Sequence, residues 1–432
     1  MVRSFFFFLT LCVFMTPKDA FSQIDSLKTR YRFAQTTFGY DMDFTPLLGH
    51  SYRLNSAGDL EKFAIGNDLA PSISITGLHF WGRVEFFTGF SLGNIDVGAS
   101  GRGGDYFRAA ATGAKFFPIR LKGGKLRPFL GVALSTFSYQ QGEGVKMKRV
   151  DYPILAGFTY TFKRGLLELG MNWYYDPQYE YYVQKDLKVP LNIPAFTVFA
   201  DYKYFFDLSI TSERMEKNGE LAANLELLKT EGSLNTFSIA AGPAYSFFTG
   251  NSSHNEVEHP YLDDYQVSLV YPDVGIGYYY FNWDLTLNFS WRVMESKLSA
   301  FGVNQSVKRN SYGFEIFKFL GDYHGFVPFA GLIGSYEALN WQEDLNGRIN
   351  FDHKTQRWIP GFIFGWDIRP TRSDWWGVRT NIRFFPYLKL PTSSGHAIDF
   401  QQIELNFLQM ILYPNRIYTY VKRNNSKKKR TP

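Results

Sequence analysis

The 432-residue sequence has a single cysteine, Cys12, and it lies in an apolar run near the N-terminus. If that run is removed during export, the mature chain has no cysteine, which excludes disulfide bridges, thiolate zinc ligands and cysteine nucleophiles. After residue 22, no stretch approaches the ~18 consecutive apolar residues that a membrane-spanning helix needs. No glycine-rich phosphate loop follows a strand and opens a helix, since Gly101-Arg-Gly-Gly104 lies between two strand-like runs.

The body of the chain has little excess charge. The formal net charge is +6, and Lys422-Arg423 together with the basic run from Lys427 to Arg430 supply six positive charges by themselves. Because the body lacks a basic surface, no nucleic-acid partner is expected. Residues 413–432 are interpreted as a basic C-terminal tail.

Residues 1–22 have the features of a secretory signal peptide. A basic residue precedes an apolar run over 5–14, and small residues precede the expected cleavage after Ser22. A membrane anchor fits less well because the run is too short to span a bilayer. A lipoprotein signal fits less well because Leu11 precedes Cys12 and the apolar run continues beyond it.

Glycine and proline positions recur two hundred residues apart. The recurring set is Gly77, Gly113, Pro128-Phe129 and Gly131, which return as Gly277, Gly313, Pro328-Phe329 and Gly331, while Gly170 matches Gly377 at a slightly longer spacing. These residue types fix special backbone geometry, so their register predicts two copies of one architecture.

Each copy contains about eight strand-like runs in which apolar and polar side chains alternate. The alternation is clearest over 167–175, 284–293, 378–384 and 402–407. The apolar face is bulky, and the opposite face mixes charged residues with glycine. Aromatic residues make up 19% of the chain, although its mean hydropathy is only −0.22. This pattern favours strands of a membrane barrel over those of a soluble sandwich.

The predicted strands alternate between tight and long connections. The first copy is expected to have strands near 35–44, 71–80, 83–92, 105–117, 127–138, 150–162, 166–175 and 195–206. The second is expected to have them near 236–248, 267–280, 283–294, 308–319, 326–340, 356–368, 375–386 and 399–412. The long polar connections are 45–70, 93–104, 176–194, 249–266, 341–355 and 387–398. Short turns at one end and long loops at the other are typical of outer-membrane barrels.

With these features, the chain resembles the outer-membrane β-barrel proteins of Gram-negative bacteria, and each half is similar to the eight-stranded small-barrel type. The Ala20-Phe-Ser-Gln23 junction and the aromatic content resemble those of the Bacteroidota. The resemblance implies an outer-membrane location, contact with membrane lipid and lipopolysaccharide, and insertion by the barrel-assembly machinery. It implies no catalytic residue. The first copy ends on aromatic residues at 202–206, as such barrels do, whereas the second continues into the basic tail.

The expected fold is all-β, a transmembrane antiparallel barrel of about sixteen strands built from two eight-stranded repeats. The expected segments are the signal peptide (1–22), the first repeat (23–206), a periplasmic linker with a short helix (207–235), the second repeat (236–412) and the tail (413–432). A lumen plug is the alternative interpretation of the linker. One sixteen-stranded barrel and two eight-stranded barrels both satisfy closure.

Charged residues on the inward face favour the single barrel, because many mixed charges need water or near-complete pairing. The lumen-facing candidates are Asp41, Glu168, Asp284, Arg292, Arg379 and Arg383. Further inward charges are Asp43, Arg83, Glu85, Asp201, Lys203 and Glu404.

Candidate catalytic and metal sites are weak. His254 and His259, followed by Asp263-Asp264, come nearest to a metal group, but their spacing matches no recognised ligand motif, so no metal or cofactor is expected. Ser135 and Ser335 are equivalent in the two copies, yet no histidine recurs beside them. The expected function is therefore non-enzymatic, a passive pore or transport component for small solutes. The alternatives are a structural or assembly barrel with a filled interior and, less favoured, a membrane-embedded hydrolase.

Overall fold

The computed structural model describes residues 34–97, 105–142, 144–162, 165–175, 177–206, 219–250, 252–262, 268, 270–323, 325–369, 371–386, 389–392 and 395–428. The expected signal peptide and the first part of the linker lie outside these residues. Among the helices in the described ranges, none is both long enough and apolar enough to cross a membrane.

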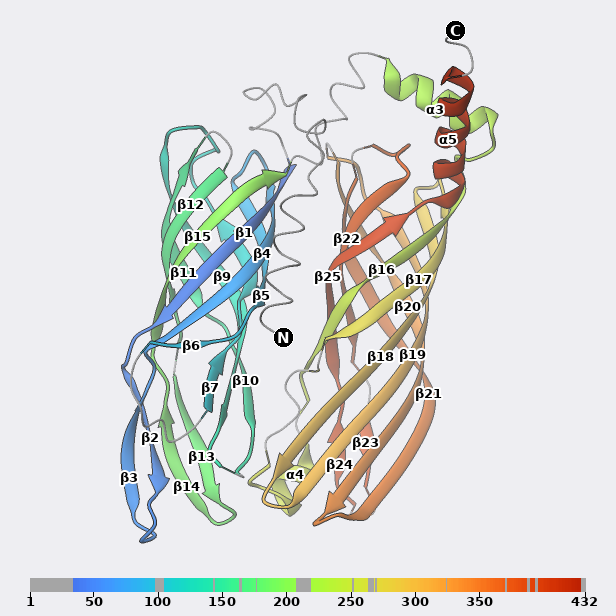
Figure 1. Cartoon of the computed structure of the whole chain (residues 1–432). Coiled ribbons are helices and arrows are strands. Elements are labelled where there is room, and N and C mark those ends of the chain that lie inside the picture. The colour runs from blue at the N-terminus through green and yellow to red at the C-terminus, as the bar shows by residue number, and fades with distance from the viewer. Residues whose placement is uncertain are drawn as a thin grey trace.

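The first half of the chain forms an antiparallel sheet that closes on itself. The strands of its ring are β1 (Ala34–Thr45), β4 (Asp68–His79), β5 (Val84–Ser91), β8 (Thr112–Phe116), β9 (Leu126–Gln140), β11 (Ile154–Thr161), β12 (Gly165–Trp173) and β15 (Phe196–Phe206). β1 pairs with β4 along one edge and with β15 along the other, which completes an eight-stranded ring (Figure 1). We call this ring the first barrel.

The second half forms a second closed barrel. Its strands, in order around the ring, are β16 (Thr236–Phe248), β17 (Tyr271–Tyr280), β18 (Leu285–Ala300), β19 (Val303–Phe319), β20 (Phe326–Leu345), β21 (Arg348–Ile368), β22 (Trp376–Phe385) and β25 (Gln402–Leu412). β16 pairs with β25 to close the ring. We call it the second barrel, and it stands beside the first (Figure 1).

The single sixteen-stranded barrel that the inward charges favoured is not what forms. β15 pairs back onto β1, from Thr36 opposite Phe206 to Phe44 opposite Val198, and β25 pairs back onto β16. The first and last strands of each ring therefore pair within their own half, and within the described residues neither ring has an open edge that could join the other. The prediction was wrong because it assumed that the inward charges need a water-filled lumen, whereas they pair with one another.

The outward–inward alternation is confirmed. Along β18, every second side chain from Thr286 to Ala300 is buried, while the intervening ones are exposed or half-buried. From Thr286 to Arg292 the buried side chains are polar, and the outward ones include Phe289 and Trp291. All sixteen predicted strands are present, although the predicted 105–117 and 150–162 strands each divide in two.

Three of the predicted long loops contain hairpins. In the first barrel, the loop at 45–70 carries β2 (Gly49–Leu54) with β3 (Leu60–Ile65), the loop at 176–194 carries β13 (Gln178–Gln184) with β14 (Leu187–Asn192), and the loop at 93–104 carries the short strand β6 (Ile95–Asp96). Outside the predicted loops, β7 (Asp105–Arg108) and β10 (Met147–Asp151) pair with β9. The second barrel adds β23 (Lys389–Pro391), β24 (Ala397–Asp399) and the short helix α4 (Ser253–Glu258). All of them extend from the same end of the barrels, which we call the hairpin end (Figure 1).

The predicted loop at 341–355 is instead the continuous tip of β20 and β21. These strands pair up to Leu345 opposite Arg348, and the turn between them is Asn346-Gly347. Both turn residues have positive φ, 51° and 82°, which a two-residue hairpin of this twist requires. The Asn-Gly pair was the local signal for this hairpin, and the sequence analysis overlooked it.

The opposite end, which we call the terminal end, carries two helices. α3 (Glu220–Thr230) lies in the predicted linker, and α5 (Pro414–Lys428) occupies most of the predicted basic tail. Arg416 of α5 is buried, and its guanidinium donates hydrogen bonds to the backbone carbonyls of Arg372, Asp374 and Leu234 at 2.8–3.0 Å. α5 is thereby fixed to the second barrel instead of extending freely.

The recurring glycines lie on strands of the same rank in the two rings. Gly77 and Gly277 lie on the second strand of each ring, and Gly113 and Gly313 on the fourth. On the fifth strands, the rings of Phe129 and Phe329 cover glycines of the sixth strands, Gly157 and Gly365. A side chain at either glycine would meet the phenylalanine ring within about 3 Å, and this close approach explains why glycine occupies both positions.

Candidate functional site

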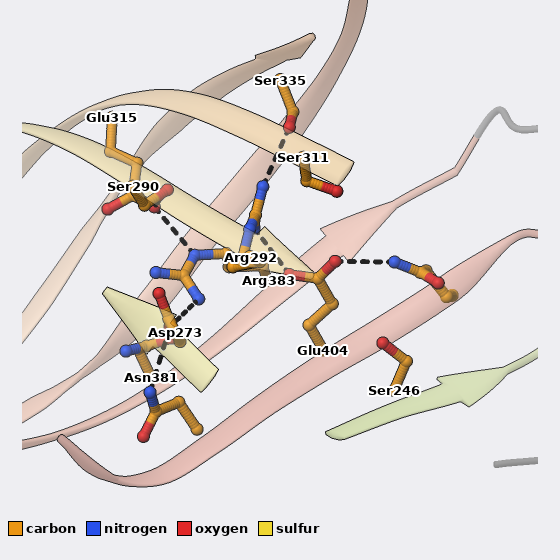
Figure 2. A network of polar contacts seen from close by, with 12 residues as sticks. Ser246, Asp273, Ser290, Arg292, Ser311, Glu315, Ser335, Asn381, Arg383 and Glu404 are labelled. Carbon is orange, nitrogen blue, oxygen red and sulfur yellow. Dashed lines mark hydrogen bonds and ion pairs between the residues drawn. The ribbon is translucent and has the colours of Figure 1, made fainter. Parts of the chain in front are cut away.

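The interior of the second barrel contains a network of buried ion pairs (Figure 2). Arg383 on β22 is one centre of it. Its Nη1 lies 2.6 Å from Asp273 Oδ2 on β17, and its Nε lies 2.9 Å from Glu315 Oε1 on β19. Asn288 and Ser290 of β18 donate to Glu315, each at 2.8 Å. One guanidinium therefore joins strands from opposite sides of the ring.

Two further arginines share the remaining carboxylates. Arg292 Nη1 lies 2.6 Å from Glu404 Oε2, and its Nη2 donates to Ser335 Oγ at 2.9 Å. Arg309 pairs with Glu337 and lies 3.2 Å from Glu404 Oε1. Three arginines thus face four carboxylates.

The network is shut off from solvent. All seven charged side chains, on Asp273, Arg292, Arg309, Glu315, Glu337, Arg383 and Glu404, are at most 2% exposed. Charges buried this deeply require pairing, because an isolated ion in the interior is strongly unfavourable. The inward charges therefore pair with one another in a buried core instead of lining an open pore wall.

Apolar layers close the second barrel above and below the network. Toward the hairpin end, Phe248, Leu298 and Trp341 belong to one buried hydrophobic cluster. Toward the terminal end, an aromatic cluster includes Phe317 and Phe329. The interior is thus filled in three layers of side chains.

The first barrel has a smaller ionic core. Lys115 on β8 lies 2.5 Å from Glu168 Oε2 on β12. Lys203 on β15 pairs with Glu85 and also lies 2.7 Å from Glu168 and 3.2 Å from Asp201. These groups are 0–5% exposed, so this core is also buried.

The two cores place an ion pair between equivalent strands of the two rings, with the signs of the charges exchanged. In the first barrel, the cation Lys115 on the fourth strand meets the anion Glu168 on the seventh. In the second barrel, the anion Glu315 on the fourth strand meets the cation Arg383 on the seventh. Lys115 and Glu315 are two hundred residues apart, the spacing of the recurring glycines.

Five of the six predicted lumen-facing residues fall into three groups. Glu168, Arg292 and Arg383 lie in the ionic cores, as described above. Arg379 makes a separate two-pronged pair with Asp367 at 2.7 and 2.9 Å, inside the aromatic layer at the terminal end. Asp41 lines a cavity of about 20 Å³ in the first barrel, beside Asp43 and Asp201.

Asp284, the sixth candidate, lies outside the ionic network. It precedes β18 in a tight turn with φ of 50°, and it accepts a hydrogen bond from Tyr279 at 2.5 Å. Arg369 and Arg372 lie 3.7 and 3.5 Å away. The predicted alternation began at Asp284, whereas β18 begins at Leu285. Asp284 lies at the mouth of the terminal end.

Several charged partners were not predicted from the sequence. They are Lys115, Asp273, Arg309, Glu315 and Glu337 of the ionic cores, and Asp367, which pairs with Arg379. The period-two pattern could have found them. Arg309, Ser311 and Glu315 share the parity of the buried positions along β19, just as Arg292 does along β18.

Comparisons with known proteins give only distant likenesses. No protein-family model and no curated protein matches the chain. Among solved structures, neisserial surface protein A is 13% identical, with a TM-score of 0.28 over 41% of this chain and 96% of its own. The attachment invasion locus protein Ail of Yersinia pestis is 10% identical, with a TM-score of 0.27 over 41% of this chain and 97% of its own. An outer-membrane channel of Pseudomonas putida F1 is 10% identical, with a TM-score of 0.22 over 88% of this chain and 94% of its own. At these TM-scores, the strand pairing itself remains the evidence for the fold.

Proposed function

We propose that this chain is an outer-membrane protein whose two small barrels anchor a platform of hairpins at the cell surface, with interiors closed to free diffusion of solutes. The observation that carries this proposal is the buried ionic network of the second barrel. Its seven charged groups span the ring and are at most 2% exposed. An eight-stranded ring is just wide enough for side chains to fill it.

The outward faces support the membrane location. Both barrels expose bulky apolar side chains around the belt that surrounds the charged cores, for example Leu130 (63%) on the first barrel and Leu332 (57%) on the second. Apolar residues outside and paired charges inside are the reverse of a soluble protein, and they suit strands surrounded by lipid. Outer-membrane lipid and lipopolysaccharide are the proposed neighbours of this belt.

Aromatic side chains near both ends of the barrels fit the interfacial girdles of membrane barrels. Trp173 and Tyr175 are exposed near the hairpin end of the first barrel. Trp283 and Trp375 are exposed at the terminal end of the second, where the ring of Tyr280 stacks on Trp283 at 5.7 Å. The termini then face the periplasm, the hairpin end faces outward, and the barrel-assembly machinery is the proposed insertion route.

The hairpin end joins the two barrels through one apolar core. Residues of the first barrel such as Phe137, Tyr181 and Leu191 cluster there with Tyr261 and Val303 of the second. A shared core at this end supports a single surface platform. A binding role at this surface, without catalytic activity, is therefore our proposal.

Duplication of one ancestral eight-stranded barrel is the proposed origin of the chain. The equal rank of the matched glycines and the fourth-to-seventh-strand ion pair in each ring support it. A source in the Bacteroidota remains a prediction from the resemblance of the signal junction.

The passive pore expected from the sequence is the alternative to this proposal, and conductance measurements distinguish the two. Purified protein, inserted and folded in planar bilayers, is expected to show no steady conductance, because buried side chains occupy the interior of each ring. A steady conductance whose ion selectivity changes in Arg383→Glu would contradict the closed interior and support the pore.

Fractionation tests the location separately. The mature protein is expected in the outer-membrane fraction after density-gradient centrifugation. N-terminal sequencing of that fraction is expected to show cleavage near Ser22. Recovery from the soluble periplasmic fraction would contradict the membrane location whatever the conductance result.

A further inference from the structure

Two histidines and a glutamate meet at the hairpin end of the second barrel. His254 belongs to α4, His259 follows it directly, and Glu343 lies near the tip of β20. The Nε2 atoms of His254 and His259 lie 3.1 and 3.2 Å from the same oxygen, Oε2 of Glu343. One ligand atom from each residue lies within 4.8 Å of the other two. The sequence showed the two histidines but not their third partner, which comes from a distant strand.

The group is built into the fold. The side chains of His254, Glu343 and His259 are 1%, 0% and 12% exposed. The side chain of Ser252 caps α4, and Ser253 exchanges hydrogen bonds with the backbone of Ala397 in β24 at 3.0 and 3.2 Å. α4 is therefore held against the neighbouring hairpins in a fixed position.

Three nitrogen atoms surround Glu343 Oε2. Besides the two imidazoles, Gln305 Nε2 donates to it at 2.9 Å, while Asn350 donates to Oε1 at 2.8 Å. A carboxylate oxygen offers about two lone-pair sites. A cation shared by the two imidazoles and the carboxylate would use imidazole lone pairs that otherwise face this oxygen.

We propose that His254, His259 and Glu343 bind a divalent transition-metal ion, and that Zn²⁺ is the ion the set fits. With bonds of about 2.0–2.1 Å, neighbouring ligands of tetrahedral zinc lie about 3.4 Å apart. The two nitrogen–oxygen distances are within a few tenths of an ångström of this value. Two imidazoles and one carboxylate suit zinc, whereas Ca²⁺ and Mg²⁺ prefer sets made of oxygen alone.

Neighbouring side chains orient the ligands. His259 Nδ1 lies 3.2 Å from the hydroxyl of Tyr261, which turns Nε2 toward Glu343. The ring of His254 lies edge-on to Trp341 at 5.6 Å, and among the described residues its Nδ1 has no hydrogen-bond partner.

The ion would act as a clamp. It ties α4 to β20, and Tyr261 and Leu262, which follow His259, pack in the apolar core that joins the two barrels. Three protein ligands leave a fourth position for water or for an external ligand. This inference does not depend on whether the barrels conduct ions.

Zinc stoichiometry tests the site directly. Full-length protein is stripped with a chelator, incubated with Zn²⁺ alone, dialysed and analysed by elemental mass spectrometry. We expect one zinc per chain in the wild type and loss of that zinc in His259→Ala and Glu343→Gln. Tyr261→Phe removes an orienting partner and is expected to weaken zinc binding about 10–100-fold.

His353→Ala is the matched control, because His353 is an exposed histidine on the paired strand β21, opposite Trp341. It is expected to keep the zinc. Absence of zinc from the wild type, equal zinc in His259→Ala and Glu343→Gln, or equal loss in His353→Ala would each overturn the proposal.

A second measurement needs no variant. Glu256 and Glu258 are exposed on α4, so a glutamate-specific protease can reach them. Zn²⁺ is expected to slow cleavage there at least several-fold in the wild type, and excess chelator is expected to restore it. Cleavage at the same rate with and without zinc would contradict the clamp.

Discussion

Removal of the Arg383 guanidinium is expected to destabilise the second barrel strongly. Arg383→Met keeps much of the side-chain volume but leaves the carboxylates of Asp273 and Glu315 without their shared cation. The contacts that are lost are 2.6 and 2.9 Å long, and all three side chains are at most 1% exposed. The barrel would then hold two like charges in a dry interior.

The size of the effect follows from two opposing terms. At these distances, with an effective dielectric constant of about 20, each ion pair is worth roughly 6 kcal/mol. Desolvation offsets most of that attraction, and breaking a buried pair by removing one partner costs about 3–5 kcal/mol. Asn406 still donates to Asp273 at 3.0 Å, and Asn288 and Ser290 still donate to Glu315. We therefore expect a loss toward the lower end of that range.

Urea unfolding in lipid vesicles, followed by tryptophan fluorescence, measures this loss. Adding Asp273→Asn and Glu315→Gln to Arg383→Met removes the unpaired charges, and the triple variant is expected to regain most of the stability. Lys308→Met is the control, since Lys308 is exposed on the outward face of β19. Equal free energies of unfolding, within about 0.5 kcal/mol, for Arg383→Met and Lys308→Met would refute the dry network.

Three other changes test separate parts of the structure. Leu332→Arg on the outward face of β20 is expected to lower the free energy of unfolding by roughly 2–4 kcal/mol if this position lies near the bilayer midplane. Ile349→Arg, at a similarly exposed position on the hairpin tip, should lower it much less, and urea unfolding in vesicles measures both. Gly365→Ala places a Cβ 2.1 Å from a backbone oxygen, so less of it should fold in refolding assays than of Gly334→Ala, whose nearest neighbour is 3.9 Å away. Arg416→Met removes four hydrogen bonds to backbone carbonyls and should expose α5 to limited proteolysis, and resistance equal to the wild type would contradict its role.

The sequence by itself determined the strands and their two faces. Alternation is a local property with a period of two residues, so runs such as 284–293 showed which side chains point outward before any pairing was known. It also determined the equal strand rank of the two halves through glycines such as Gly113 and Gly313. Its errors were local as well: Asp284 lies one residue before its strand, and Asn346-Gly347 was an unread turn.

Only the tertiary structure decided how the sheet closes and which charges meet. Backbone hydrogen bonds are alike on every strand edge, so the sequence carries no local mark that β15 returns to β1 or that β25 returns to β16. The same limit hid the partners of Arg383 and brought Glu343 unforeseen to His254 and His259. Period-two alternation specifies that a side chain points inward, but its partner across a closed ring depends on ring size and register, which are properties of the whole barrel.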